Sequence, residues 1–226
     1  MLQELIRREF NRWAEQGRTR GIEKSHWEIT RRLIDLMRID VHDNVVDLGC
    51  GIGWATRVLA QNAPRGLVLG IDLSDRMVAA ARGSYRNPPN AFFLVADAAG
   101  MPCPESFCKS LLSVEAMYYW PDLEGAFSEV FRILRPGGRA FFLINYYKEN
   151  IYGHSWAKYI DIPVHLLGAE DYMTTLAKAG FQNCSHRRMI DSTPVGEDWT
   201  PTRWFPTRQA QAKFQAEGAL LLVAEK

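Results

Sequence analysis

The stretch VVDLGCGIGW, from Val45 to Trp54, constrains the fold of this chain more than any other. Two β-branched residues and an aspartate lead into three glycines at alternate positions, and a helical pattern, WATRVLAQN, begins at the end of the stretch. Glycine permits the positive φ angles of a tight turn and leaves room for a ligand to lie against the backbone. The stretch therefore predicts a strand, a glycine turn and a helix, with a ligand above the turn at the carboxyl end of the strand.

Short apolar segments alternate with helical segments from Val45 to Asn145. Strands that are apolar on both faces and joined through helices form parallel sheets covered by helices, and right-handed crossovers then give a doubly wound sheet. The pattern therefore predicts an α/β fold with a Rossmann-like, doubly wound sheet. The expected strands are NVVDL, LVLGID, AFFLVA, SLLSVE and RAFFLIN, and the expected helices are WATRVLAQN, DRMVAAARG and LEGAFSEVFRIL.

The regions on either side of this core have their own patterns. Residues 2–16 place apolar side chains at helical spacing before GRTRG breaks the run. Ser25 is followed three residues later by Glu28, a capping box that predicts the start of a second helix. Beyond Asn145 we expect an irregular segment, a helix that ends at Gly180, and two further strands around NCSHRRMI and GALLLVAEK.

Charge and composition argue against several classes of protein. The formal net charge is +1 and the arginine pairs are scattered along the chain, so nucleic acid is not an expected partner. No apolar run approaches the roughly 20 residues that span a bilayer, and the N-terminus lacks the apolar core of a signal peptide, so we expect a cytoplasmic protein. No metal site is expected, because the cysteines do not form the two close pairs that enclose zinc; they are Cys50, Cys103, Cys108 and Cys184.

The spacing of the glycines argues against the common nucleotide motifs. A dinucleotide fingerprint needs a third glycine three positions after the second. Gly49, Gly51 and Gly53 are instead spaced by two, and Trp54 stands where that third glycine would fall. NAD and FAD are therefore disfavoured, and a nucleoside triphosphate is disfavoured because the sequence has no P-loop lysine followed by Ser or Thr.

Three acidic residues belong to the carboxyl edge of the predicted sheet. Asp72 ends the second strand, where a carboxylate can bind both hydroxyls of a ribose, or can cap the helix that follows. Asp97 follows the third strand, where it can accept a hydrogen bond from the exocyclic amine of an adenine held between Leu73 and Met77. With Asp47 in the first strand, these acids suit an adenosyl ligand that is cationic rather than phosphorylated.

Five segments, in this order, resemble the class I S-adenosylmethionine-dependent methyltransferases: VVDLGCGIGW, GIDLSDRMVAAAR, ADAAGMP, SVEAMYYWPDLEGAFSEVFRILRPGG and LAKAGF. The resemblance covers residues 42–182 and is greatest to the type 11 branch, which includes the ubiquinone and menaquinone C-methyltransferases and many small-molecule enzymes. It implies a seven-stranded, mostly parallel sheet whose last strand, ALLLVAE, runs antiparallel. It also implies S-adenosyl-L-methionine as the cofactor, with S-adenosyl-L-homocysteine as its product.

A chain of 226 residues lies within the size range of one α/β domain, so we expect a single methyltransferase domain over residues 1–226. The resemblance implies its parts: N-terminal helices over 1–40, a cofactor-binding core over 41–145, a substrate-covering insertion over 146–168, and the C-terminal part of the sheet over 169–226. The N-terminal helices are expected either to close over the cofactor or to pack on the flank of the sheet.

The resemblance further implies which residues bind the cofactor. Asp72 would hold the ribose hydroxyls, and Asp97 with Ala98 would meet the adenine. Ser113, near the end of the fourth strand, would lie beside both cofactor and acceptor. The methionine part of the cofactor would lie over a set of residues in and after the first strand, which are Asp47, Gly49, Cys50 and Gly51.

The candidate catalytic residues are Glu115, Tyr118 and His154. Glu115 interrupts an apolar run at the carboxyl end of the fourth strand, where it would face the acceptor or bond to the next helix. Tyr118 and Tyr119 stand where many members of the family have histidines, and their rings either contact the acceptor or belong to the core. His154 and His165 lie in the expected insertion, where histidine suits proton transfer near neutral pH or serves a structural role.

We therefore expect methyl transfer to a small, partly apolar or aromatic molecule. Holding the acceptor in line with the methyl group can supply roughly 7–11 kcal/mol, and a base is needed only when the acceptor must lose a proton. Two alternatives stay open: a non-catalytic module that binds S-adenosylmethionine, and an NAD-linked oxidoreductase. Aromatic residues of the insertion would line the acceptor pocket or pack within the insertion; these are Tyr146, Tyr147, Tyr152, Trp156 and Tyr159.

Overall fold

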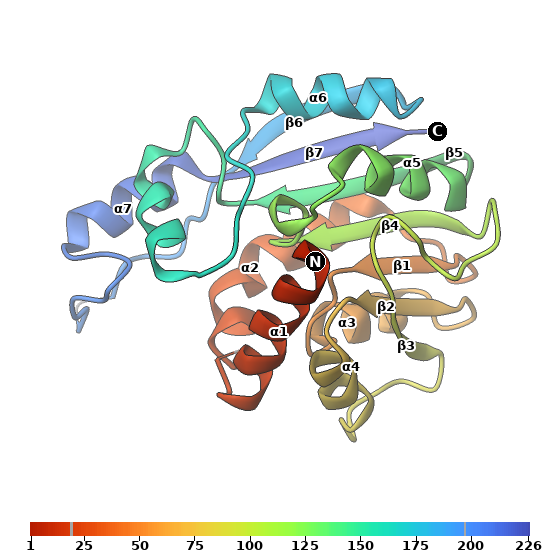
Figure 1. Cartoon of the computed structure of the whole chain (residues 1–226), viewed down its shortest axis with the longest axis horizontal. Coiled ribbons are helices and arrows are strands. Elements are labelled where there is room, and N and C mark those ends of the chain that lie inside the picture. Colours follow the sequence, from red (N-terminus) through yellow and green to blue (C-terminus); the bar gives the residue numbers. More distant parts are fainter. Residues whose placement is uncertain (19, 197) are drawn as a thin grey trace.

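The computed structural model describes residues 1–18, 20–196 and 198–226. Seven strands form one sheet in the order β3-β2-β1-β4-β5-β7-β6, and the helices lie around it (Figure 1). The strands are β1 Val45–Leu48, β2 Val68–Asp72, β3 Ala91–Val95, β4 Cys108–Val114, β5 Leu134–Ile144, β6 Gln182–Met189 and β7 Ala219–Glu225. The helices are α1 Leu2–Glu15, α2 Arg20–Met37, α3 Trp54–Asn62, α4 Asp75–Arg82, α5 Leu123–Ile133, α6 Ala169–Lys178 and α7 Arg208–Glu217, with 3-10 segments η1 Met117–Tyr119 and η2 Ile151–Tyr159.

Strand β1 lies at the point where the order of the sheet reverses. After β3 the chain returns to the other side of β1 to form β4, and β1 pairs in parallel with both β2 and β4. The connections on the two sides of such a point diverge and leave a crevice at the carboxyl ends of the strands. Ligands of doubly wound proteins bind in this crevice, so the topology places the candidate site above β1 and β4.

The last strand lies between β5 and β6. Phe142 of β5 is opposite Leu222 of β7, and His186 of β6 is opposite the same leucine from the other side; both pairings are antiparallel. The predicted architecture is therefore confirmed: a Rossmann-like, seven-stranded sheet that is parallel except for its last strand, with helices preceding it.

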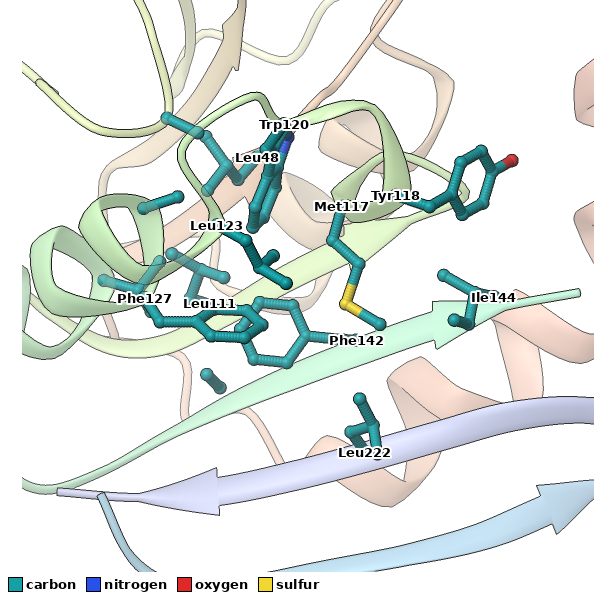
Figure 2. Packing of buried hydrophobic residues seen from close by; sticks show 14 of the residues in the cluster. Leu48, Leu111, Met117, Tyr118, Trp120, Leu123, Phe127, Phe142, Ile144 and Leu222 are labelled. Carbon is teal, nitrogen blue, oxygen red and sulfur yellow. The ribbon is translucent and has the colours of Figure 1, made fainter. Parts of the chain in front are cut away.

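Alternate residues of the central strands face two apolar layers. Val46, Leu111 and Phe142 belong to the layer that α5 and α6 cover, whereas their neighbours Val45 and Leu112 belong to the layer that α2 and α3 cover. Figure 2 shows part of the first layer, in which side chains of β1, β4, η1, α5, β5 and β7 converge. Fully burying a side chain of this size contributes about 1.5–3 kcal/mol. The central strands are thus covered on both faces by apolar side chains.

The predicted start of the second helix is wrong. Helix α2 begins at Arg20, so Ser25 lies inside it and its hydroxyl oxygen is 3.0 Å from Nδ1 of His26. Glu28 does not turn back to cap the helix but pairs with Arg31 one turn later, at 3.3 Å. A Ser-x-x-Glu sequence is compatible with a helix interior as well as a helix start, since the glutamate can find an i+3 partner. The consequence is that His26 lies on a continuous helix that reaches the site.

Two elements that were not expected from sequence also reach the site. Helix α7 begins after Thr207, whose hydroxyl accepts a hydrogen bond from the amide of Ala210 at 3.1 Å. The segment η2 lies within the expected insertion and packs against α7. In the part of the chain that the structure describes, no helix is long and apolar enough to cross a membrane.

Candidate functional site

A cavity of about 610 Å³ opens at the carboxyl edge of the sheet. Leu48, Asp72 and Val114 mark the ends of β1, β2 and β4 along its wall. Helices α1 and α2 supply further lining residues, and so do η2 and the segment between β6 and β7. Its volume lies within the range of small-molecule and cofactor sites. The cavity therefore occupies the crevice that the strand order creates.

The three glycines of the turn after β1 all have positive φ angles, of +79°, +52° and +78°, but they serve different purposes. A Cβ atom at Gly49 would lie 2.3 Å from Cβ of Ala116, and one at Gly53 would lie 2.4 Å from the ring of Phe93. A Cβ atom at Gly51 would meet nothing within 4 Å. The outer two glycines thus permit close packing of the turn, whereas Gly51 leaves open space beside the cavity that it lines.

Asp47 lies buried at the base of this turn and lines the cavity. Its Oδ2 accepts a hydrogen bond from the hydroxyl of Thr56 at 2.6 Å. Burial raises the pKa of Asp47 to about 7, and the nearby charge of Asp72 acts in the same direction, while the Thr56 hydroxyl opposes it. This carboxyl group can therefore change its charge near neutral pH.

Asp72 accepts hydrogen bonds from two backbone amides, one in the turn after β1 and one just after β2. Its Oδ2 accepts from the amide of Gly51 and its Oδ1 accepts from the amide of Ser74, each at 2.8 Å. The cap of helix α4 is Ser74, whose hydroxyl accepts from the amide of Met77. Burial raises the pKa of Asp72, and the two backbone amides oppose that rise. Asp72 thus lines the cavity in a fixed orientation, and Ser74 rather than Asp72 caps helix α4.

The third acid, Asp97, lies beside the N-terminal helix. Its Oδ1 accepts from the amide of Ala99 at 2.9 Å, and its Oδ2 accepts from the side-chain amide of Gln3 in α1. Ala98, Leu73 and Met77, the other residues expected around an adenine, also line the cavity. Because Ile6 and Phe10 of α1 line it too, the first helix forms part of this wall.

Cys50 and Ser113 differ in their relation to the cavity. Cys50 lines it, and burial raises the pKa of its thiol well above the usual range, with Asp72 and Asp47 adding to the effect. Ser113 is 1% exposed and is not a lining residue. The next three residues of the chain, Val114, Glu115 and Ala116, line the cavity instead.

Glu115 is held firmly where β4 ends. Its backbone has a φ of +54°, a region that costs non-glycine residues on the order of 1–3 kcal/mol. Its Oε1 accepts from the backbone and side-chain amides of Asn145, at 2.7 and 2.9 Å, and its Oε2 accepts from the hydroxyl of Tyr118 at 2.8 Å. Tyr118 lies at the edge of the apolar layer, with its hydroxyl directed away from Phe142 (Figure 2). The pair thus presents polar groups to the cavity from a rigid support.

His26 approaches Glu115 from helix α2. Its Nε2 is 3.8 Å from Oε1 of the glutamate, and Ser25 and His26 both line the cavity. Sequence reasoning gave His26 no catalytic role, because the helix start was misplaced and nothing local connects residue 26 with residue 115. The N-terminal extension therefore contributes to both ends of the cavity.

The histidines of the insertion face the backbone rather than the cavity. Nε2 of His154 is 3.0 Å from the carbonyl oxygen of Tyr147, and Nε2 of His165 is 2.9 Å from the carbonyl oxygen of Trp120. Neither histidine is a lining residue. The structure thus brings Glu115 and Tyr118 together and places His154 elsewhere.

Aromatic rings form another part of the cavity wall. The rings of Tyr118, Tyr119, Tyr146 and Trp156 pack with centroid distances between 4.6 and 5.7 Å. Tyr147 is instead fully buried outside this wall, and its hydroxyl donates to the carbonyl of Gly218. Other aromatic lining residues come from the insertion and from segments that sequence reasoning did not connect with the site: Tyr152, Tyr159, Trp204, Phe205 and Phe214.

The lining residues suit an adenosyl sulfonium. Asp47, Asp72, Asp97 and Glu115 supply negative charge, and the aromatic wall is itself attractive to a cation. Gly51 supplies open space at the turn where the ligand would lie closest to the backbone. Among the described residues, no group of three or more His, Cys, Asp and Glu side chains is placed to hold a metal ion.

Comparison with known proteins gives the class. Residues 46–142 match the family described as "Methyltransferase domain". A solved structure, the putative methyltransferase in a complex with the Haloferax volcanii Trm112 methyltransferase activator, is 32% identical and has a TM-score of 0.87, with 96% of this chain and 97% of that chain covered. The chain therefore belongs to the class I S-adenosylmethionine-dependent methyltransferases, and the cofactor of this family is S-adenosyl-L-methionine.

Curated relatives are longer and match a smaller part of this chain. The malonyl-[acyl-carrier protein] O-methyltransferase of Hahella chejuensis is 32% identical over 112 residues, which are 50% of this chain and 40% of that protein. The demethylmenaquinone methyltransferase of Tropheryma whipplei is 29% identical over 139 residues, which are 59% of this chain and 56% of that protein. The chain spans about half the length of the curated relatives it matches.

Proposed function

We propose that this chain transfers the methyl group of S-adenosyl-L-methionine to a small molecule with an apolar or aromatic body. The observation that carries the proposal is the composition of the cavity. The lining includes a glycine turn with nearby acids and a group of aromatic rings. Glu115 connects the two, since it bonds to Tyr118 and its neighbour Ala116 lies against Gly49 of the turn. A volume of about 610 Å³ is within the range of sites that bury a drug-sized ligand.

The cofactor would lie along the carboxyl ends of β1, β2 and β3. Gly49, Cys50 and Gly51 would meet its methionine part, with the carboxylate of Asp47 near its positive charges. Asp72 would accept from the ribose hydroxyls, since each of its oxygens keeps a lone pair beyond the backbone bond it already accepts. Adenine would lie among the side chains around the end of β3, which are Leu73, Met77, Asp97 and Ala98.

The chemical step needs little beyond alignment. When bound, the cofactor supplies an electrophilic methyl group on a positively charged sulfur. A lone pair of the acceptor would form the new bond to the methyl carbon as the carbon–sulfur bond breaks. The sulfur would keep the two electrons of the broken bond and become a neutral thioether. Alignment of this kind can lower the barrier by roughly 7–11 kcal/mol.

Glu115 and Tyr118 are proposed to position the acceptor. Three N–H and O–H groups orient the carboxylate of Glu115, and Oε2 keeps a free lone pair for an N–H or O–H group of the acceptor. A proton that the acceptor loses would pass to this carboxylate or to water. His154 is not included in this proposal, since its ring nitrogen contacts a backbone carbonyl away from the cavity.

Labelled cofactor tests the proposal directly. The protein is first titrated with S-adenosylhomocysteine by calorimetry and then incubated with methyl-labelled S-adenosylmethionine and a panel of phenols, carboxylic acids, amines and thiols. The proposal expects binding of S-adenosylhomocysteine and transfer of label to at least one apolar or aromatic acceptor. Absence of binding contradicts the proposed cofactor site.

The two alternatives predict different results, the first in these experiments and the second in a thermal unfolding assay. A non-catalytic module binds S-adenosylhomocysteine but transfers no label to any acceptor of the panel. An NAD-linked oxidoreductase is stabilised against thermal unfolding by NAD and not by S-adenosylhomocysteine. Trp54 at the start of α3, where a dinucleotide motif needs glycine, argues against the second alternative.

We also propose a partner of the Trm112 type, because the Haloferax volcanii relative is in a complex with that activator. We expect this partner to bind at edge strand β3, because the two edges of the sheet differ in polarity. Edge strand β3 exposes the apolar side chains of Phe92 and Val95, at 49% and 45%, whereas edge strand β6 exposes polar side chains such as Arg187. Polar edges discourage association, and apolar edges favour it.

Co-expression with a Trm112-type protein from the same genome tests this partner. The wild-type chain should co-purify with it, Phe92→Asp should not, and Arg187→Asp on the opposite edge should behave as the wild type. Unfolding temperatures of the separate chains show whether each variant is folded. Equal recovery of the partner by both variants would exclude β3 as the contact.

A further inference from the structure

Two arginines line the cavity, and the methyl transfer described above uses neither. Arg18 follows helix α1, and Arg203 lies in the segment that leads from β6 to α7. Both are exposed, so they lie at the rim rather than at the base. Because the lining acids are concentrated near the turn after β1, the cavity combines an acidic cofactor end with positive charge at its rim.

Each arginine is stacked on a tryptophan of the same cavity. Cζ of Arg203 is 4.1 Å from the ring centroid of Trp204 and 5.6 Å from that of Tyr159. Cζ of Arg18 is 5.8 Å from the ring centroid of Trp13. Stacking of a guanidinium on a ring orients its plane and leaves its N–H groups available at the edge. The cation of Arg203 is therefore oriented without the use of its hydrogen-bond donors.

Two arginines that do not line the cavity, by contrast, are paired with carboxylates. Arg12 pairs with Glu9 at 2.5 Å, and Arg188 pairs with Glu217 at 2.5 Å. Over residues 1–18, 20–196 and 198–226, neither Arg18 nor Arg203 forms an ion pair or donates a side-chain hydrogen bond. Asp191 also lines the cavity. It accepts hydrogen bonds from the amide of Thr193 in its own segment and from the side chain of Gln215 in α7.

We propose that Arg203 binds an anionic group of the methyl acceptor, a carboxylate or a phosphate. The fork of its N–H groups can donate to two oxygens of such a group. The apolar body of the acceptor then lies against the aromatic wall, with its reacting atom toward Glu115, and Arg18 adds a second positive charge at the rim. This assignment rests on the proposed methyl transfer, because it names the class of acceptor for that reaction.

Three ligands with one ring system test the assignment: 2-naphthoate, 2-naphthyl phosphate and the neutral 2-naphthamide. Each is titrated by calorimetry into protein saturated with S-adenosylhomocysteine. At least one anion should bind ten times more tightly than the amide or better, and the tighter of the two anions identifies carboxylate or phosphate as the group recognised. Arg203→Gln should remove the preference, and Arg203→Lys should retain part of it, since lysine keeps the charge but not the fork.

Arg187→Gln is the matched control, because it removes the same charge from the exposed face of β6, far along the sheet order from β1. It should keep the full preference for the anion. Equal binding of amide and anions, no measurable binding of either anion, or an unchanged preference in Arg203→Gln would each overturn the assignment. Binding of S-adenosylhomocysteine is measured first: its failure contradicts the methyltransferase site itself, whereas success without an anion preference contradicts only the role of Arg203.

Discussion

The two ends of the cavity are built in different ways. The end proposed to bind the cofactor consists of strand ends and the tight turns that follow them. Its carboxylates Asp72 and Asp97 accept from backbone amides a few residues away or in the turn after the adjacent strand. The end proposed to bind the acceptor consists of side chains from α2, η1, η2, the segment before α7, and α7 itself. A site built on regular elements is determined by local geometry, whereas a site assembled from connecting segments depends on the whole fold. The first can stay constant while the second changes with the acceptor.

The largest expected effect is at Asp72, which joins the turn after β1 to the start of α4. Asp72→Ala removes the acceptor of two backbone hydrogen bonds and the proposed ribose contact. Hydrogen bonds to a charged group contribute about 1.5–3 kcal/mol each, so affinity for S-adenosylhomocysteine should fall by roughly 100-fold or more. Calorimetry measures the affinity, and a loss below threefold would exclude Asp72 from the cofactor end.

Glycines of the same turn should separate folding from binding. Gly49→Ala places a Cβ atom 2.3 Å from Cβ of Ala116, so the free energy of unfolding should fall by about 3 kcal/mol or more. Gly51→Ala meets no atom within 4 Å, and only its φ of +52° costs stability, about 1–2 kcal/mol. Denaturant unfolding measures both. Gly51→Ala should nevertheless lose most of its affinity for S-adenosylhomocysteine, and an unchanged affinity would show that the cofactor does not lie there.

Substitutions at the acceptor end should affect turnover and leave cofactor binding intact. Glu115→Gln keeps the shape of the side chain but loses its charge, and we expect methyl transfer to fall 10- to 100-fold, within the range of single positioning and proton-transfer contributions. His154→Asn is the control, because its ring lies outside the cavity lining. Methyl transfer is measured for both variants, and His154→Asn should keep the activity of the wild type. Both variants should bind S-adenosylhomocysteine within twofold of the wild type, which would show that the two ends of the cavity act independently.

The smallest expected effect on ligand binding is a dependence on pH at Asp47, whose pKa is raised to about 7 by burial. The ionised form favours a cationic ligand, so affinity for S-adenosylmethionine should rise from pH 6 to 7 and level off above 8. Unfolding free energy should change in the opposite direction. The folded state binds the extra proton between the pKa of the unfolded chain and that of the folded one, so stability falls as pH rises from about 4 to about 7, by roughly 1.4 kcal/mol per unit of pKa difference.

Asp47→Asn separates this group from the other carboxylates. Titrations from pH 5 to 9 on wild type and variant give the difference that belongs to residue 47. The variant should bind S-adenosylmethionine with an affinity that changes less across this range. The same slope in both proteins would assign the titration to another group.

The sequence predicted the strand, the glycine turn and the acids at the strand ends because their determinants are local. A strand, alternate glycines and a helix occupy 18 consecutive residues, from Val45 to Asn62, and Asp72 and Asp97 follow from the ends of the next two strands. The seven-stranded sheet was likewise predictable, although the direction of β7 came from a family resemblance and not from its pattern. Local signals therefore suffice where the chain is regular.

The acceptor end could not be predicted in the same way. Trp204 and Phe205 lie in an irregular segment without periodicity, and only the tertiary fold brings them beside η2. The sequence placed His26 in helices that could close over the cofactor, but it gave no sign that His26 lies beside Glu115, because no local pattern connects residues so far apart in the chain. Ser113 was expected at the site but is buried away from the cavity, whereas Glu115, two positions later, lines it. A sequence pattern does not place the end of a strand accurately enough to distinguish such positions.

A crystal structure with S-adenosylhomocysteine tests the central claim most directly. We predict that the adenosyl group lies at the carboxyl ends of β2 and β3, with the ribose hydroxyls within hydrogen-bond distance of Asp72 and the homocysteine part over Gly51. The aromatic side chains of the cavity, which include Tyr118, Trp156 and Trp204, then remain available for the acceptor. S-adenosylhomocysteine bound among those aromatic side chains, with Asp72 still bonded only to Gly51 and Ser74, would contradict the division of the cavity into a cofactor end and an acceptor end.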